Sequence, residues 1–165
     1  MVNWDAIGAV GEILGAIAVV ATLGYLAVQV RAARDSAADA NRLNRANGVT
    51  QMALEFVGNS DLANSVMKSH KTEDYYTHFA STLDISFDDA SRSDWFHVYY
   101  FWLHWGQYSS SKTEEDLAEL SNVIRAFYGI PAVRYSWDHS PFSKPVLDPA
   151  FVNYVNQILS GAQDQ

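Results

Sequence analysis

Two histidines and a carboxylate fall at helical spacing in the aromatic segment between residues 88 and 108. Asp94, His97 and His104 lie on one face if this segment is a helix. Imidazole and carboxylate groups bind metals, and a histidine pair can also hold a haem iron. His97 and His104 are two turns apart, about 10 Å, which is too far for one zinc ion. We therefore predict a buried polar seam in which the histidines hydrogen-bond to Asp94 or a tyrosine, with a metal or haem site as the alternative.

A second group combines a serine, a histidine and a carboxylate in the stretch Ser136-Trp137-Asp138-His139-Ser140. These residue types form hydrolase triads, in which the three side chains point at one another. Adjacent residues rarely meet that condition, and the sequence has neither a GxSxG elbow nor a glycine-rich phosphate loop. The stretch predicts a structural turn without a catalytic residue. We expect Arg134 to stack on Trp137, three positions later.

Glu12 is the only charged residue in the apolar run over residues 6–28. Inside a membrane, a charged carboxylate costs about 2.5–3.5 kcal/mol on insertion scales. The group is therefore either protonated or turned toward a partner helix or a wet cavity. A ring of these carboxylates in an oligomer would line a cation pathway, whereas the simpler alternative is a protonated Glu12 that hydrogen-bonds within its own bundle.

Composition excludes several classes of function. The chain of 165 residues contains no cysteine, which excludes disulfides, thiolate metal sites, cysteine nucleophiles and lipidation on cysteine. Its net charge of −8 argues against nucleic acid, whose phosphates require a basic surface. We predict no catalytic residue, no metal ligand and no cofactor.

The apolar run has the length of a membrane span. Trp4 and Tyr25 bracket it and lie about 32 Å apart along a helix, close to the roughly 30 Å of a bilayer's hydrocarbon core. Both aromatics suit the membrane interface. We therefore predict a transmembrane anchor over residues 1–30. A cleaved signal peptide would open with basic residues, which residues 1–5 lack, and a soluble core helix is rarely this long and this free of charge.

The charges that flank the run predict its orientation. All 11 Lys and Arg residues follow it, beginning with Arg31 and Arg34. Because basic residues stay on the cytoplasmic side, we expect a single membrane span with the N-terminus outside and residues 31–165 in the cytoplasm. Arg31 and Arg34 would then also meet anionic lipid headgroups and serve as interface anchors.

Small residues form a stripe along the same run. They follow one another in steps of three and four and include one GxxxG pair: Gly8, Gly11, Gly15, Ala18 and Thr22. In lipid, helices associate where small residues let their backbones approach closely. The stripe therefore predicts an interface with a second copy of the chain or with another membrane protein.

No stretch of the remaining sequence alternates convincingly at period two, so the predicted fold class is all-α. The membrane helix should continue as a long cytoplasmic helix over residues 31–57 and end at Gly58-Asn59-Ser60. Several shorter helices over residues 60–165 should pack with it, the densest being the aromatic segment over residues 95–105, which we expect at the centre of the core. Capping patterns predict helix starts at Ser60 or Asp61, Ser86, Thr113 and Pro149, with stops near Ser69, Tyr108 and Gly129.

The start of the chain resembles a widespread group of uncharacterised bacterial proteins. The resemblance rests on residues 4–12 and on Tyr25-Leu26-Ala27-Val28-Gln29-Val30-Arg31, which follow that group's WxxIgaigEiiGaiaVvaTLxYLaxQxR pattern. Residues 129–134 with Trp137, Phe142 and Phe151 resemble the group's C-terminal pattern, whereas Ala32-Ala33 depart from its usual Gln and Asn. The resemblance implies a single-span protein of the bacterial inner membrane with a helical cytoplasmic domain and implies no activity.

These inferences predict a non-enzymatic, membrane-anchored assembly or accessory protein. It would be a homo-oligomer or a small subunit of a larger membrane complex, with the lipid bilayer and a second membrane helix as partners and no nucleic acid. Two alternatives stay open: a small oligomeric ion channel with Glu12 along its pathway, and a metal or haem binder using His97 and His104.

Overall fold

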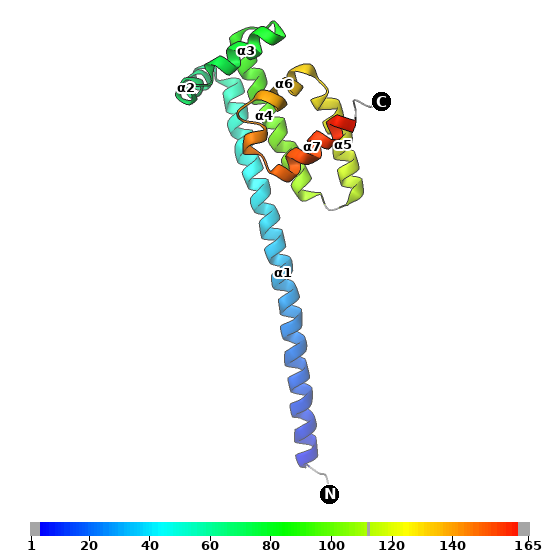
Figure 1. Ribbon diagram of the computed structural model, residues 1–165. Coiled ribbons are helices and arrows are strands. Elements are labelled where there is room, and N and C mark those ends of the chain that lie inside the picture. The colour runs from blue at the N-terminus through cyan, green and yellow to red at the C-terminus, as the bar shows by residue number, and fades with distance from the viewer. Residues whose placement is uncertain (1–3, 112, 162–165) are drawn as a thin grey trace. The chain divides into compact units, whose positions relative to one another are not determined.

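The computed structural model describes residues 4–111 and 113–161, and residues 4–6 by their backbone alone. Within this part of the chain all regular elements are helical (Figure 1), which confirms the predicted all-α class. They are α1 (Trp4–Gly58), α2 (Ser60–His70), α3 (Glu73–Leu83), α4 (Phe87–Ser110), α5 (Glu114–Tyr128), α6 (Pro131–His139), the 3-10 turn η1 (Lys144–Val146) and α7 (Pro149–Gly161).

The chain divides into two compact units, Met1–Asn41 and Arg42–Gln165. α1 belongs to both, because it continues as one helix past the end of the predicted span. The long extension expected over residues 31–57 is thus present. The second unit contains the last part of α1 and all the shorter helices.

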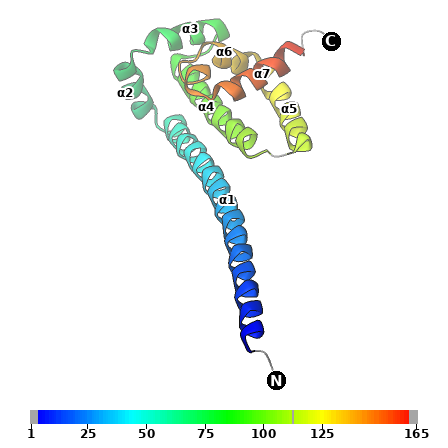
Figure 2. The same ribbon diagram turned by 60° about the horizontal axis from the view of Figure 1, so that its bottom comes forward.

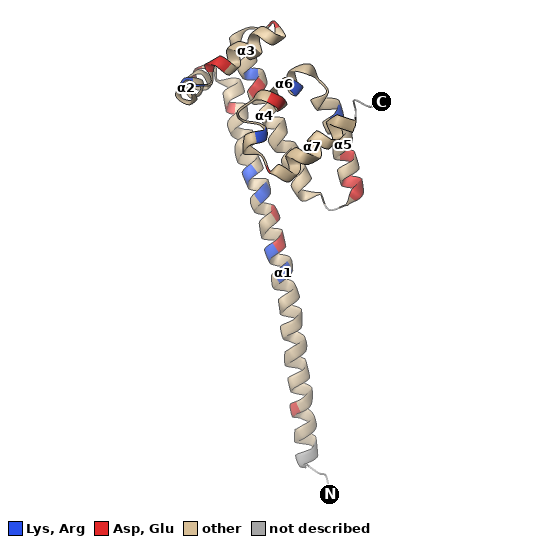
Figure 3. Cartoon of the chain, in the orientation of Figure 1, with Lys and Arg blue, Asp and Glu red and all other residues tan. Residues whose placement is uncertain are grey.

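The first unit is a helix whose described side chains are exposed, apart from that of Asp39, which is half-buried. Figure 3 shows one acidic position in a long stretch without other charges, before basic and acidic residues alternate further along α1. This helix is long and apolar enough to cross a membrane, and none of its qualifying 18-residue window is buried. A core helix of a soluble protein can have similar length and composition, but it would be mostly buried.

Local side-chain caps set the start of two central helices, as predicted. Ser86 precedes α4 and accepts a hydrogen bond of 3.1 Å from the backbone N–H of Asp89. Thr113 and Asp116 form a reciprocal capping box at the start of α5, with both hydrogen bonds at 3.1 Å. Each cap satisfies backbone donors that the first helical turn leaves unpaired.

The end of α1 and the start of α2 lie one residue from expectation. Asn59 caps α2, because its side-chain oxygen accepts a hydrogen bond of 3.0 Å from the backbone N–H of Leu62. The predicted caps, Ser60 and Asp61, are therefore the first residues of the helix itself. An asparagine in extended conformation serves this position as well as a serine or an aspartate.

Two helices lie where the sequence analysis placed none. α3 follows Thr72, which provides no side-chain cap. α6 begins with Pro131 at its first position, where the missing N–H costs nothing because no partner exists for it there. The prediction of a turn at residues 136–140 is accordingly wrong for most of its length, since α6 extends through His139.

α4 is the central helix of the second unit. α2, α3, α5 and α6 all contact it, and α5, α6 and α7 gather beside it in both views (Figures 1 and 2). Trp95, Phe101 and Trp105 are buried on α4, which confirms the prediction of an aromatic core helix. Its surface is not covered all round, because Phe96 is 41% exposed.

The last part of α1 packs directly against α4. A Cβ atom added at Gly106 would lie 3.2 Å from the Cβ of Ala46, so glycine is what permits this close approach. At the preceding position of each helix, the guanidinium of Arg45 lies 5.7 Å from the centroid of the Trp105 ring. Ala46 and Ala53 are both buried, so this part of α1 forms one side of the hydrophobic core.

Candidate functional site

The most exposed apolar surface of the described chain is the first half of α1. Twelve large apolar or aromatic side chains between Ile7 and Val30 are 49–69% exposed. Burying one such aliphatic side chain contributes roughly 1.5–3 kcal/mol. Exposed apolar surface on this scale marks a site that lipid or another protein covers.

The predicted stripe of small residues lies within this surface. A Cβ atom added at Gly8, Gly11 or Gly15 would meet no other atom within 4 Å. Thr22 donates its hydroxyl to the carbonyl oxygen of Ala18 at 2.8 Å, which satisfies this polar group inside the helix. The stripe is therefore a shallow surface, and its one hydroxyl group is paired. No other part of the described chain packs against it.

The other predicted membrane residues lie along the same helix. Glu12 follows Gly11 and its side chain is exposed. Tyr25 is 64% exposed, and Arg31 and Arg34 are exposed on the next turns. The side chain of Trp4, the other predicted aromatic anchor, lies outside the described residues.

Asp94 is the centre of a buried polar cluster in the second unit. Its carboxylate is fully buried and accepts hydrogen bonds from three hydroxyl groups. Tyr75 donates at 2.8 Å, Tyr76 at 3.2 Å and Ser140 at 3.0 Å. The two tyrosines belong to α3 and Ser140 caps the end of α6, so one carboxylate fastens both helices to α4.

No Lys, Arg or His side chain among the described residues forms an ion pair with the Asp94 carboxylate, so the cluster holds it by hydroxyl groups. Burial raises the pKa of Asp94 to about 6, although the hydroxyl hydrogen bonds oppose that rise. Burial and the neighbouring carboxylate raise the pKa of Tyr75 and Tyr76 far above the ordinary value. Both tyrosines therefore stay protonated and remain donors.

The two histidines of α4 both contact the Phe127 ring but have different hydrogen-bond partners. The Nδ1 atom of His97 is 2.8 Å from the hydroxyl oxygen of Ser136, and that of His104 is 3.4 Å from the hydroxyl oxygen of Tyr128. The predicted tyrosine partner is thus present for His104, whereas His97 pairs with a serine. Burial lowers the pKa of each imidazole to about 4, so both are neutral at pH 7.

The spacing of these histidines provides no shared metal site. The described residues contain no group of three or more His, Cys, Asp or Glu side chains that could hold a metal ion. His97 contacts α6 through Ser136, and His104 contacts α5 through Tyr128. Their hydrogen bonds connect α4 to two different helices, which is a structural role.

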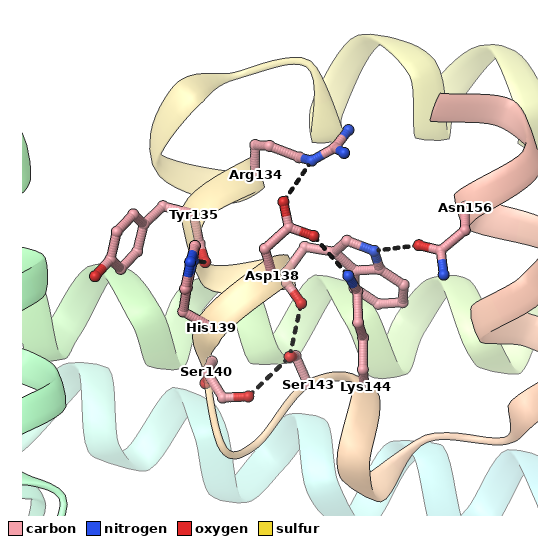
Figure 4. Close-up of polar contacts among 9 residues, drawn as sticks. Arg134, Tyr135, Asp138, His139, Ser140, Ser143, Lys144 and Asn156 are labelled. Atoms are coloured by element: carbon pink, nitrogen blue, oxygen red, sulfur yellow. Dashed lines mark hydrogen bonds and ion pairs between the residues drawn. The ribbon is translucent and has the colours of Figure 1, made fainter. Parts of the chain in front are cut away.

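Asp138 forms ion pairs at the surface instead of joining a triad. Figure 4 shows its carboxylate between Arg134, at 2.7 Å, and Lys144, at 2.5 Å. Burial raises the pKa of Asp138, but the hydrogen bonds and charges of Lys144 and Arg134 together lower it below the ordinary value. The expected stacking of Arg134 on Trp137 is wrong: Lys144 lies over that ring instead, 5.6 Å from the centroid.

The neighbouring serines and histidine point elsewhere. The Nδ1 atom of His139 lies 3.0 Å from the backbone carbonyl oxygen of Tyr135 (Figure 4). Ser136 contacts His97, and Ser140 donates to Asp94. The stretch 136–140 thus has the residue types of a triad without its geometry.

Comparison of the chain with protein-family profiles, curated proteins and solved structures found no match. The resemblance of residues 4–12 and 25–31 to a bacterial membrane-protein group therefore stays an expectation.

Proposed function

We propose that this chain is a non-enzymatic, membrane-anchored assembly or accessory protein. The first half of α1 spans the bacterial inner membrane once, with the N-terminus outside and the second unit in the cytoplasm. The observation that carries this proposal is the row of twelve large exposed side chains between Ile7 and Val30. A lipid environment removes all of them from water at once, whatever direction they face around the helix.

The charges along α1 support the orientation. Glu12 is the only acidic residue between Ile7 and Val30, and basic residues begin at Arg31. Exposed arginines directly after an apolar run favour the cytoplasmic side. Arg31 and Arg34 can also reach anionic headgroups there, at about 1 kcal/mol for each charge near the surface.

The stripe of small residues supports the assembly role. Open space at Gly8, Gly11 and Gly15 lets a second helix approach to backbone contact. Larger residues would hold the helices apart. The second helix belongs either to another copy of this chain or to another membrane protein.

The assembly role is tested by the double variant Gly11→Leu and Gly15→Leu. Leucines on the stripe should shift the detergent-solubilised protein to smaller particles in a light-scattering measurement. Gly24→Leu is the matched control, because Gly24 also has nothing within 4 Å but lies about half a turn away from the stripe. An unchanged particle size in the double variant would count against the stripe.

One observation favours a second candidate, a small ion channel. The exposed side chain of Glu12 lies one position from Gly11. Association along the stripe would bring several of these carboxylates close together, as in cation pathways lined by acidic rings. Ion flux distinguishes this candidate from a purely structural assembly.

A further inference from the structure

The second unit contains a cleft of about 390 Å³ that the proposed function does not use. Ten residues line it, from the end of α1, from α2, from α4 and from the segment over residues 142–146. This volume lies near the lower end of the roughly 300–1,000 Å³ typical of small-molecule sites. The cleft lies entirely within the second unit.

The floor of the cleft is buried and its rim is exposed. Trp95 lies between two aromatic rings, with centroid distances of 4.3 Å to Phe56 and 4.8 Å to Phe142. Phe56 and Trp95 are buried, whereas Met52 and Val146 at the rim are 44% and 49% exposed. An incoming group would therefore cover exposed apolar side chains without displacing the core.

The lining has almost no hydrogen-bonding capacity. Nine of the ten lining residues are apolar or aromatic, and the tenth is His70. The indole Nε1–H of Trp95 has no partner among the described residues, but this atom is buried and is not open to the cleft. A strand or loop of another protein would bring backbone N–H and C=O groups into this cleft, where they would find nearly no partners.

The size of the surface also argues against a protein partner. A stable protein interface uses roughly 20–30 residues on each side, about two to three times the number that line this cleft. A methylene chain needs no hydrogen bonds. The free energy that it gains by leaving water grows in proportion to its length. The cleft therefore suits an unbranched hydrocarbon chain.

One end of the cleft offers a contact for a polar head. His70 is exposed at the end of α2, and its ring centroid lies 6.0 Å from that of Phe142. An imidazole can donate a hydrogen bond to a carboxylate. We infer that this cleft binds the acyl chain of a free fatty acid, with the carboxylate at His70. This inference does not depend on the membrane anchoring of α1.

Photo-crosslinking tests the inference on the full chain. The protein in lipid nanodiscs is mixed with a palmitic acid that carries a diazirine in its chain, irradiated, digested and analysed by mass spectrometry. We expect adducts within residues 49–56, 95–102 or 142–146. Met52→Glu places a carboxylate at the rim and should reduce these adducts at least tenfold.

Leu54→Glu is the matched control, since Leu54 is 47% exposed on the same helix but does not line the cleft. It should leave the adducts within twofold of the unmodified protein. Val146→Glu repeats the test from another part of the lining, in the segment over residues 142–146. Equal midpoints of thermal unfolding for the three variants show that each is folded. Adducts confined to residues 7–30, or unaffected by both rim variants, would overturn the inference.

Two further results would also overturn it. A photoreactive phospholipid in the nanodisc that labels the cleft, without competition from excess palmitic acid, would assign the cleft to bilayer lipid. Crosslinking of a co-purified polypeptide to residues 49–56 or 142–146 would assign it to a protein. If the chain proves water-soluble, the same labelling runs without nanodiscs, so the two proposals fail separately.

Discussion

The hydroxyl of Tyr75 donates a 2.8 Å hydrogen bond to the carboxylate of Asp94, and this contact joins α3 to α4 across 19 positions of sequence. Tyr76 and Ser140 donate to the same carboxylate. A buried carboxylate with several donors and no cation stabilises the fold only while those donors stay in place. The cluster therefore fixes how three helices of the second unit meet.

Removal of this acceptor should destabilise the second unit. Asp94→Ala leaves at least two buried hydroxyl groups without a partner and should lower the free energy of unfolding by about 3 kcal/mol. Asp94→Asn keeps a hydrogen-bond acceptor and should lower the free energy of unfolding by less than Asp94→Ala does. Denaturant unfolding followed by near-UV circular dichroism measures both. Asp88→Ala, at an exposed position on the same helix, is the control, and an equal effect there would contradict the role of the cluster.

The buried ionisable groups predict how stability depends on pH. The folded-state pKa of Asp94 is raised to about 6, so its contribution is present at acidic pH and is lost as the pH rises through 6. The folded-state pKa values of His97 and His104 are lowered to about 4, so their contributions are present above about 6.5 and are lost as the pH falls toward 4.

Between pH 4 and 6 the two histidines affect the pH dependence of stability more than the single aspartate does. At pH 5 the unfolded chain binds two protons on the histidines, and the folded chain binds one on Asp94. Stability should therefore rise with pH by about 1.4 kcal/mol per unit. Asp94→Asn should roughly double this slope, and His97→Gln should flatten it. A slope of opposite sign in the unmodified protein would refute the assignment.

Glycine substitutions should separate a packed position from an open one. Gly106→Val places a branched side chain against Ala46 and should lower the free energy of unfolding by about 1–3 kcal/mol. Gly48→Ala lies in an exposed part of α1 with nothing within 4 Å and should stabilise by roughly 1 kcal/mol. Thermal unfolding measures both. Equal tolerance at the two positions would contradict the close approach of α1 and α4.

The channel candidate makes its own prediction for Glu12. If the protein is a structural assembly, liposomes containing it should show no cation flux, and Glu12→Gln should not change that result or the particle size. A conductance in the unmodified protein that disappears in Glu12→Gln would favour the channel. Ala16→Gln, one helical turn further along α1, controls for the new amide.

Helix starts with local signals could be predicted from the sequence. The side-chain cap at Ser86, the capping box at Thr113 and the proline that begins α7 each lie within four residues of the helix that they start. The apolar run is equally local, since its length alone marks α1. These features need no knowledge of the rest of the fold.

The predicted stop of α2 near Ser69 lies within one residue of its end at His70. α3 was missed, because neither of its ends has a local signal. Lys71 and Asp84 follow α2 and α3 and adopt left-handed backbone conformations usually taken by glycine, so no glycine marks either end. α3 also starts without a side-chain cap. The break between α2 and α3 therefore depends on packing and not on a turn residue.

The polar cluster shows the same limit. Helical periodicity placed Asp94 and the histidines on one face, which is a property of α4 alone. Their partners come from 18 to 46 positions away. No pattern in the sequence distinguishes Tyr76 or Ser140 from other tyrosines and serines, so only the packing of α3 and α6 reveals them.

The central claim is that lipid covers residues 7–30, and extraction of membranes tests it most directly. Bacteria that express the full-length chain are lysed, and the membranes are washed with alkaline carbonate, which releases peripheral proteins. We predict that the chain stays in the pellet and dissolves only in detergent. A full-length chain that remains in the supernatant after ultracentrifugation, without detergent, would contradict the proposal.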